Sequence, residues 1–309
     1  MDKNKIFEMI SNVVGTENVK IDEPMCNHTT FKVGGNADIF VTPKTVDSIK
    51  DIIDICKNEN IDYYIIGKGS NLLVGDKGYR GVIICVYNTL DNVQIVDNNG
   101  NMSRVVAGAG ITLSKLANII AGHSLEGFEF ASGIPGTLGG AVTMNAGAYG
   151  GEIKDCIVSA TVMDQRGNVV KIDRDNLDLS YRHSIIMMEQ YIVLEAEFEF
   201  QKGDKDAIYD KMHDLNQRRK DKQPLEYPSA GSTFKRPEGY FAGKLIMDSG
   251  LAGYTVGGAC VSTKHCGFVI NKDNATAKDI RELMDNVDSI VFDKYGVHLE
   301  PEVRMLGEF

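Results

Sequence analysis

Apolar positions in the first third of the chain change their period from about two to about three and a half, which predicts alternating strands and helices. Residues 37–42 and 63–66 are short apolar runs typical of strands. Between them, apolar side chains recur at helical spacing at Val46, Ile49, Ile52, Ile53 and Cys56. The second run leads directly into the loop Gly67-Lys68-Gly69-Ser70-Asn71. We therefore expect a β-α-β unit whose glycine loop faces a ligand.

The middle of the chain predicts a second group of strands. Residues 82–86 form one more strand, and the polar, turn-rich residues 88–101 suggest a seam before a new strand at 104–107. Residues 111–121 have the pattern of a helix. Residues 158–163 and 169–172 predict a hairpin, and residues 192–200 alternate as a half-buried strand. Residues 133–151 are too glycine-rich for a regular core element, so we expect an ordered binding loop there. The less favoured alternative is that these glycines serve only close packing between subdomains.

The last third begins with a helix that places Ile208, Met212 and Leu215 on one face and ends in a basic run at residues 218–222. We expect this run to lead into a third unit with a helix near 241–247 and a longer helix over 280–291. A terminal strand should place residues 297, 299, 303 and 305 on one face and 298, 300, 302 and 304 on the other. The predicted units are residues 1–88, 89–203 and 204–309.

Composition narrows the class of protein. The chain has 309 residues, is 43% hydrophobic and carries a formal net charge of −10. This charge argues against a general nucleic-acid binder, so an anionic ligand needs local basic groups. No segment approaches the roughly 20 apolar residues of a membrane span, and we expect a soluble, cytoplasmic protein without membrane insertion. The six cysteines form no CxxC and the six histidines no HExxH, so we expect no disulfide and no metal site.

Two glycine motifs permit more than one interpretation. The Gly67 loop begins like a dinucleotide fingerprint, but Leu72 occupies the third glycine position. Its amides suit a pyrophosphate, and a tight turn explains the same residues equally well. The segment from Gly239 to Leu245 is one residue too short for a P-loop and lacks its hydroxyl, which excludes ATP hydrolysis.

Three further residues have the chemistry of a proton-delivery site. Ser232 supplies a hydroxyl, Glu302 a carboxylate, and Arg182, beside Tyr181, a guanidinium suited to a carboxylate or to developing negative charge. Taken alone, Ser232 is typical of a turn, Glu302 of a solvated strand and Arg182 of a surface ion pair. No spacing argument places Ser232 and Glu302 together.

Considered in order, these motifs resemble one family. The chain is similar to the UDP-N-acetylenolpyruvoylglucosamine reductases, flavoenzymes that complete UDP-N-acetylmuramic acid for bacterial peptidoglycan and so serve cell-wall biogenesis, cell shape and division. The matching segments span nearly the whole chain: residues 27–35, 67–71, 133–151, 180–182, 231–235 and 299–304. The resemblance implies an α+β fold, with a two-subdomain FAD-binding part of the vanillyl-alcohol-oxidase type and a C-terminal α+β substrate-binding domain.

The resemblance also implies the reaction and the catalytic residues. UDP-N-acetylglucosamine enolpyruvate is expected to receive hydride from flavin N5 after reduction of FAD by NADPH. Arg182 and Glu302 then stabilise the enol-like intermediate, and Ser232 protonates it. No metal takes part.

The family's binding positions carry over in the same way. The expected FAD-binding residues are Gly67, Lys68, Gly69, Ser70, Asn71, Gly133, Gly136, Thr137, Gly139, Gly140, Asn145, Ala146 and Gly147. The expected substrate-binding residues are Tyr181, Lys222, Lys235, Arg236 and Lys244, and the basic ones supply the local positive charge that a diphosphate needs.

The chain departs from part of the family and leaves competing hypotheses open. Residues 199–218 contain no insertion carrying a substrate-covering tyrosine, which resembles the shorter, type II subclass, and Arg236 stands where other members have asparagine. The alternatives are a flavin-dependent oxidase on the same scaffold, an inactive nucleotide-sugar-binding flavoprotein, and, least favoured, a nicotinamide dehydrogenase without flavin. We favour a monomer.

Overall fold

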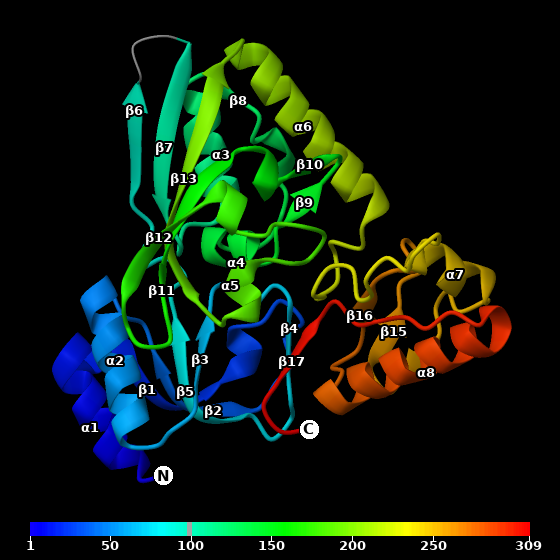
Figure 1. Ribbon diagram of the computed structural model, residues 1–309. Coiled ribbons are helices and arrows are strands. Elements are labelled where there is room, and N and C mark those ends of the chain that lie inside the picture. Colours follow the sequence, from blue (N-terminus) through cyan, green and yellow to red (C-terminus); the bar gives the residue numbers. More distant parts are fainter. Residues whose placement is uncertain (98–100) are drawn as a thin grey trace.

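The structure is a computed structural model that describes residues 1–97 and 101–309. It contains three groups of elements that follow one another along the chain (Figure 1). The helices of the described residues are α1 (Lys3–Val14), α2 (Val46–Asn58), α3 (Leu113–Gly122), α4 (Leu138–Thr143), α5 (Ile185–Met188), α6 (Lys205–Lys222), α7 (Ala242–Asp248) and α8 (Ala277–Tyr295).

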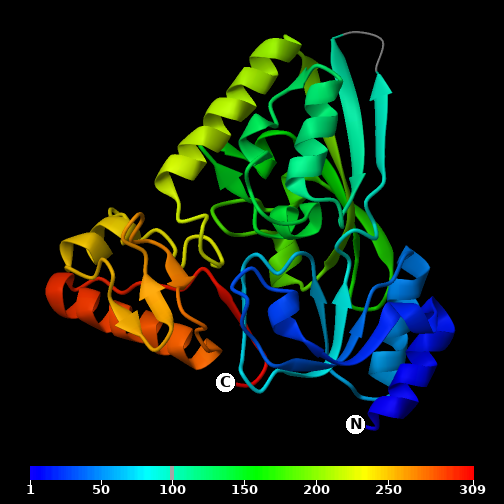
Figure 2. The same cartoon turned by 180° about the vertical axis from the view of Figure 1, so that it is seen from behind.

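The first group contains a four-stranded sheet in the order β1-β2-β5-β3, formed by β1 (Val19–Pro24), β2 (Asn36–Val41), β5 (Tyr79–Cys85) and β3 (Tyr63–Ile66). Strands β2, β5 and β3 are parallel, as the predicted β-α-β unit requires. Alternate side chains bury both faces of the sheet: Ile39 packs with α1 and α2, whereas Phe40 packs toward β4 (Leu72–Val74). Figure 2 shows α1 and α2 side by side against this sheet.

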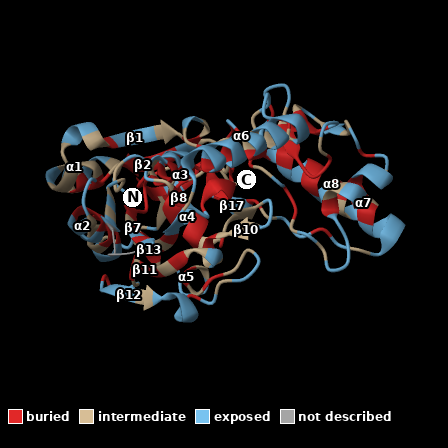
Figure 3. Ribbon diagram, turned by 90° about the horizontal axis from the view of Figure 1, so that it is seen from above, coloured by how far each residue is buried: buried red, intermediate tan, exposed pale blue. Residues whose placement is uncertain are grey.

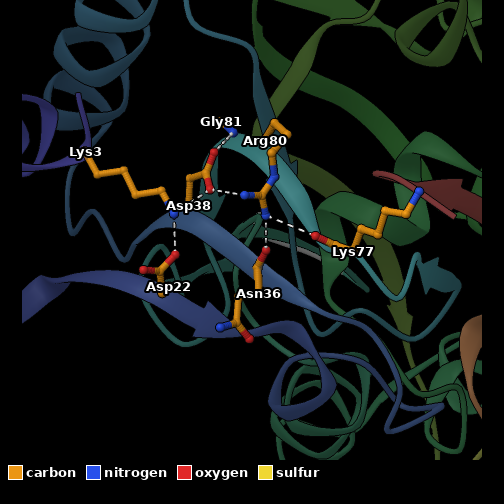
Figure 4. Close-up of polar contacts among 7 residues, drawn as sticks. All are labelled: Lys3, Asp22, Asn36, Asp38, Lys77, Arg80 and Gly81. Carbon is orange, nitrogen blue, oxygen red and sulfur yellow. Dashed lines mark hydrogen bonds and ion pairs between the residues drawn. The ribbon is translucent and has the colours of Figure 1, made fainter. Parts of the chain in front are cut away.

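A buried carboxylate fastens α1 to the first sheet (Figure 4). The side chain of Asp38 on β2 is 5% exposed, and its Oδ1 lies 2.6 Å from Arg80 Nη1 and 2.9 Å from Lys3 Nζ. Its Oδ2 accepts a hydrogen bond of 3.2 Å from the Gly81 backbone N–H. Two cations and a backbone donor thus compensate a charge whose burial alone is costly. The Asp38 carboxylate therefore links strand β5 to helix α1.

The second group contains a six-stranded antiparallel sheet. Its path is β12-β11-β13-β7-β6, from β12 (Val169–Asp173), β11 (Ile157–Met163), β13 (Ile192–Lys202), β7 (Met102–Gly108) and β6 (Val93–Asp97), and β8 (Leu125–Glu126) pairs with β13. The hairpin and the 192–200 strand are confirmed. The core of this sheet holds an aromatic cluster in which the Phe128 and Phe198 rings lie 5.5 Å apart.

Two predictions for this part of the chain were wrong. Residues 88–101 were expected to be a polar seam, but they contain β6, which pairs with β7. Residues 133–151 were expected to be one loop, but they contain α4 and the short strands β9 (Gly147–Ala148) and β10 (Gly151–Glu152). In α4, Gly139 lets the helix approach the second group closely, since a Cβ there would lie 3.0 Å from Ala109 Cβ. Close packing thus overrides glycine's low helix propensity.

Helix α6 lies against the second group. Its Ile208 and Met212 belong to the same core as the six-stranded sheet, and the helix contacts α3 and β8. The predicted division at residue 204 places this helix with the third unit, whereas its packing associates it with the second. The three-unit division itself stays a prediction.

The third group contains α7, α8 and the antiparallel strands β14 (Thr255–Val256), β15 (Ala259–Val261) and β16 (Val269–Asn271). Helix α8 buries Ile280, Leu283 and Val287 and exposes its other side, so buried and exposed residues alternate along it (Figure 3). No helix in residues 1–97 or 101–309 is long and apolar enough to cross a membrane.

The chain then returns to the first group through β17 (Arg304–Leu306), which pairs in parallel with β4. The predicted alternation of the terminal strand was wrong in part. Leu299 and Val303 are buried as expected, but Met305 is 40% exposed. The proline at position 301 donates no backbone hydrogen bond and precedes the short β17, so the segment is not one continuous strand.

Candidate active site

The fold brings Ser232 beside Glu302. The Glu302 N–H donates to the Thr233 carbonyl at 2.8 Å, and the Lys235 N–H donates to the Glu300 carbonyl at 2.8 Å. Thr233 is fully buried, and its own N–H donates to the Gly267 carbonyl at 2.8 Å. We call these two paired segments, residues 232–235 and 300–302, the wall. Ser232, its first residue, is exposed at the surface.

Arg182 reaches the same wall from the second group. Ser180 and His183 exchange backbone hydrogen bonds of 3.2 Å, which leaves Tyr181 and Arg182 at the tip of a tight turn. Arg182 adopts a φ of 55°, a left-handed conformation that is uncommon outside glycine and is concentrated at functional sites. Its Nε donates to Glu302 Oε1 at 2.5 Å. The structure therefore gathers all three residues that the sequence singled out for catalysis.

The carboxyl group of Glu302 is protonated more readily than a free glutamate. Only 10% of its side chain is exposed, and burial raises its pKa above the usual 4.5. The nearby charges of Arg182 and, to a lesser extent, Lys235 act in the opposite direction. The net upward shift lets Glu302 retain a proton to higher pH while it stays paired with a guanidinium.

The Gly67 loop presents unused backbone donors next to this wall. None of the N–H groups of residues 67–71 donates a hydrogen bond to a protein acceptor within residues 1–97 and 101–309. Gly69 has a φ of 63°, and a Cβ on Gly67 would lie 2.1 Å from Thr137 Oγ1. Only glycine permits this close approach of the two loops. Successive free amides in such a loop form a concave anion-binding site, which fits the pyrophosphate of FAD.

The loop is also tied to the wall. Asn71 Nδ2 donates to the Glu302 carbonyl at 3.0 Å, and the Asn71 carbonyl accepts from the Arg304 N–H at 3.0 Å. The expected cofactor loop and the expected catalytic carboxylate are therefore adjacent in space.

The glycine-rich residues 133–147 divide into two sets. Gly133, Gly136 and Thr137 lie toward the Gly67 loop or α6, and their N–H groups have no acceptor in the described part of the chain. Gly140 is exposed on α4. Outside this segment, Lys68 of the Gly67 loop lies near the Tyr87 ring. Gly139, Asn145, Ala146 and Gly147 instead make internal packing or hydrogen bonds.

Three of the five expected substrate-binding residues line one pocket. Tyr181, Lys235 and Arg236 surround a volume of about 520 Å³, and the Arg236 N–H donates to the Tyr181 hydroxyl at 3.1 Å. Lys222 lies exposed at the end of α6, and Lys244 pairs with Asp248 at 2.7 Å on the surface of α7. The structure does not bring Lys222 and Lys244 to the lining of this pocket.

Sequence reasoning missed Arg219. It lines a second pocket of about 400 Å³ together with Gly133 and Asn216, and it has no ion-pair partner among the described residues. Burial lowers its pKa, although it remains a cation. The signal was present, because Arg219 continues the Ile208, Met212 and Leu215 stripe by one more turn. A cation on the buried stripe of a helix is a candidate anion contact.

Comparisons with known proteins agree with this geometry. The UDP-N-acetylenolpyruvoylglucosamine reductase from Lachnoclostridium phytofermentans is 56% identical over 99% of this chain and 98% of its own length. The one from Clostridium novyi is 54% identical over 100% of this chain and 97% of its own length. The chain belongs to the UDP-N-acetylenolpyruvoylglucosamine reductase family.

Family models and a solved structure extend this result. The C-terminal domain of UDP-N-acetylenolpyruvoylglucosamine reductase matches residues 223–306, and an FAD binding domain matches residues 37–173. The crystal structure of the Thermus caldophilus enzyme has a TM-score of 0.77 and 32% identity over 93% of this chain and 98% of its own. The expected α+β fold with an FAD-binding part and a C-terminal reductase domain is confirmed. Assignment to the shorter subclass stays a prediction.

Proposed function

We propose that this chain reduces UDP-N-acetylglucosamine enolpyruvate to UDP-N-acetylmuramate, with FAD as cofactor and NADPH as reductant, in cytoplasmic peptidoglycan precursor synthesis. Family membership over the whole chain supports this reaction. The observation that carries the mechanism is the partly buried Arg182–Glu302 pair beside the exposed Ser232, directly next to the Gly67 loop.

The residues present fit FAD. The free amides of residues 67–71, together with those of Gly136 and Thr137, would hold its phosphates, and Arg219 adds a positive charge near Gly133. When bound and reduced, FAD supplies hydride to the terminal carbon of the enolpyruvyl group. The closeness of Asn71 to Glu302 would bring that substrate group beside the catalytic wall.

Hydride addition leaves a negative charge on the carbon next to the substrate carboxylate, and the chain's own residues can manage this charge. The Arg182 guanidinium offers a planar fork of donors that matches a carboxylate and the enolate that develops from it. Glu302, whose pKa is raised, holds Arg182 in place and can carry a proton close to the same atoms. Ser232 is the exposed hydroxyl on this wall, and we assign to it the proton that completes the product.

The nucleotide part of the substrate has a matching pocket. Arg236 supplies positive charge for a diphosphate, and Tyr181 supplies an aromatic face. Lys235 adds its charge when it exchanges its ion pair with Glu300, which lines the same pocket, for the ligand. The Arg236 guanidinium lies 4.0 Å from the Phe241 ring centroid, so its orientation is already restricted before a ligand binds. Lys222 and Lys244 lie outside this lining, and Lys244 is already paired with Asp248, so only Lys222 would add longer-range attraction.

Anaerobic kinetics of the purified flavoprotein test this proposal. Wild type and Ser232→Ala are compared for flavin reduction by NADPH and for NADPH oxidation with and without the enolpyruvyl substrate. We expect Ser232→Ala to keep flavin reduction and to lose about 10²- to 10⁴-fold in turnover, the usual contribution of a positioned proton donor. Turnover that is unchanged in Ser232→Ala would contradict the role of Ser232.

The same measurements, repeated with oxygen admitted, separate the competing functions. A reducible flavin that reacts with oxygen but not with the enolpyruvyl substrate would indicate an oxidase. Binding of the substrate without flavin reduction would indicate a nucleotide-sugar-binding flavoprotein. Protein that retains no flavin would contradict the cofactor assignment.

A further inference from the structure

We infer that Asn145 is a positioning residue that holds the Arg182 turn against Glu302, rather than a ligand of the cofactor. The sequence placed Asn145 among the expected FAD-binding residues. The inference rests on the proposed function, because it assigns a task within that reaction.

The side-chain amide of Asn145 makes its hydrogen bonds to other residues of the protein. The residue is 1% exposed, and its Nδ2 donates to the Ser180 carbonyl at 3.1 Å and to Glu152 Oε2 at 2.8 Å. Its Oδ1 accepts from the Lys154 N–H at 2.9 Å. Three of the four hydrogen bonds that the amide can make are therefore inside the protein, both of its donors included, and an exposure of 1% closes the remaining acceptor position to a cofactor.

The Ser180 carbonyl is the first anchor of the Arg182 turn. Ser180 and His183 close the turn through their mutual backbone bonds, so holding Ser180 also sets the direction in which Arg182 leaves the backbone. A second anchor lies one residue beyond the turn, where the buried Ser184 hydroxyl donates to the Thr143 carbonyl at 2.6 Å. The residues that bind these two anchors, Asn145 and Thr143, lie at or just after the C-terminal end of α4.

Helix α4 thus links two parts of the site. It begins next to Thr137, whose hydroxyl lies against Gly67 and whose N–H has no acceptor among the described residues, and it ends at the residues that hold the Arg182 turn. Asn145 itself has a φ of 43°, and asparagine tolerates this left-handed conformation better than most residues. The backbone and the side chain at this position therefore both favour asparagine.

Asn145 also controls a competing carboxylate. Glu152 is held by Lys154 at 2.9 Å and by the Asn145 amide. These contacts lower the pKa of Glu152, Lys154 most strongly, and Arg182 adds a smaller effect in the same direction. Arg182 is thus within electrostatic reach of two carboxylates but forms its ion pair with Glu302. Loss of the Asn145 amide would leave Glu152 held by Lys154 alone and better able to compete for Arg182.

A double-mutant cycle between Asn145 and Arg182 tests the inference. Asn145→Gly suits the positive φ, and Asn145→Asp, which keeps the size but lacks the donors, serves if the glycine variant does not fold. We expect either variant to reduce kcat by about 10- to 100-fold, since a small misplacement of a catalytic group has effects of this size. In an Arg182→Ala background the same change should alter kcat by no more than about twofold, because the residue it positions is gone.

Two further measurements separate positioning from cofactor binding and from general damage. Flavin content and flavin reduction by NADPH should stay within about twofold of wild type. The free energy of unfolding should show a coupling between positions 145 and 182 in the same cycle, a result that does not depend on turnover. The matched control is Asn18→Ala, which removes the hydrogen bond of 2.6 Å that Asn18 Nδ2 donates to the Val14 carbonyl, far from this turn, and should leave kcat unchanged.

Three results would overturn the inference. Loss of flavin from folded Asn145→Asp would restore the cofactor-ligand role. Equal reductions of kcat with and without Arg182 would show that Asn145 acts elsewhere. An unfolding cycle without coupling would show that Asn145 does not hold the turn, and this outcome is distinguishable from a failure of the proposed reaction, which would appear as absent turnover in wild type.

Discussion

The two partners of the Arg182–Glu302 pair are held in different ways. Glu302 lies on a segment fixed by backbone bonds on both sides: its N–H donates to the Thr233 carbonyl, and β17 pairs with β4 directly after it. Arg182 lies at the tip of a left-handed turn that side chains hold, above all those of Asn145 and Ser184. Backbone hydrogen bonds thus hold Glu302, whereas side-chain hydrogen bonds hold the turn that carries Arg182.

This difference has a consequence for substitutions. A substitution other than proline leaves the backbone N–H and C=O groups in place, so the position of Glu302 should resist most single substitutions around it. The position of Arg182 depends on two side chains, either of which one substitution removes. We therefore expect activity to be more sensitive around Arg182, and stability to be more sensitive around Glu302.

Among the substitutions that test this comparison, the largest effect should come from Arg182 itself. Arg182→Lys keeps the charge but loses the planar fork, so kcat should fall by about 10²- to 10³-fold while NADPH still reduces the flavin. Stopped-flow measurement of the two half-reactions checks this. The matched control is Arg218→Lys, which changes an exposed pair with Asp214 on α6 and should leave both half-reactions unchanged. An equal loss in both half-reactions would mean that Arg182 acts on the cofactor instead.

An intermediate effect should distinguish the anchors of the two partners. Ser184→Ala removes the turn anchor and should reduce kcat by about tenfold. Thr233→Val removes the buried hydroxyl that accepts from the Val269 N–H at 2.8 Å, which should lower the free energy of unfolding by about 1–3 kcal/mol. Because backbone bonds still hold Glu302, kcat of the folded Thr233→Val protein should change less than that of Ser184→Ala. Denaturant unfolding and steady-state kinetics of both variants decide it, and the reverse order would refute the comparison.

The smallest effect concerns pH. Burial raises the pKa of Glu302 above 4.5, so the folded protein binds this proton more tightly than the unfolded chain. The associated stability is full at low pH and is lost as the pH rises through the folded pKa. Glu302→Gln cannot titrate, so its free energy of unfolding should improve relative to wild type as the pH rises, by at most about 1.4 kcal/mol per pH unit between the two pKa values.

Denaturant unfolding at several pH values measures this slope, with Glu282→Gln on the exposed side of α8 as the control. A difference between Glu302→Gln and wild type that is constant with pH, or that moves against the variant, would show that the ion pair with Arg182 outweighs burial.

The sequence by itself determined most elements and the family. Period-two and period-3.6 patterns located β2, α2, β3, the β11–β12 hairpin and α8, because a buried face imposes its spacing on the chain. The ordered motifs identified Arg182, Ser232 and Glu302 through resemblance to the family. Local pattern failed at α4, where six residues with two glycines form a helix only because neighbouring parts of the second group pack closely against it.

Only the tertiary structure decided which of these residues meet. Asn71 and Glu302 are 231 positions apart, and Arg182 and Glu302 are 120 apart. Periodicity reports that a face is buried but not which distant segment buries it. The wall at Ser232, the lack of an ion-pair partner for Arg219 among the described residues and the inward amide of Asn145 were therefore beyond its reach. The sequence shows which residue stands at each position of the site. Which distant residue it contacts depends on the packing of segments that only the complete fold brings together.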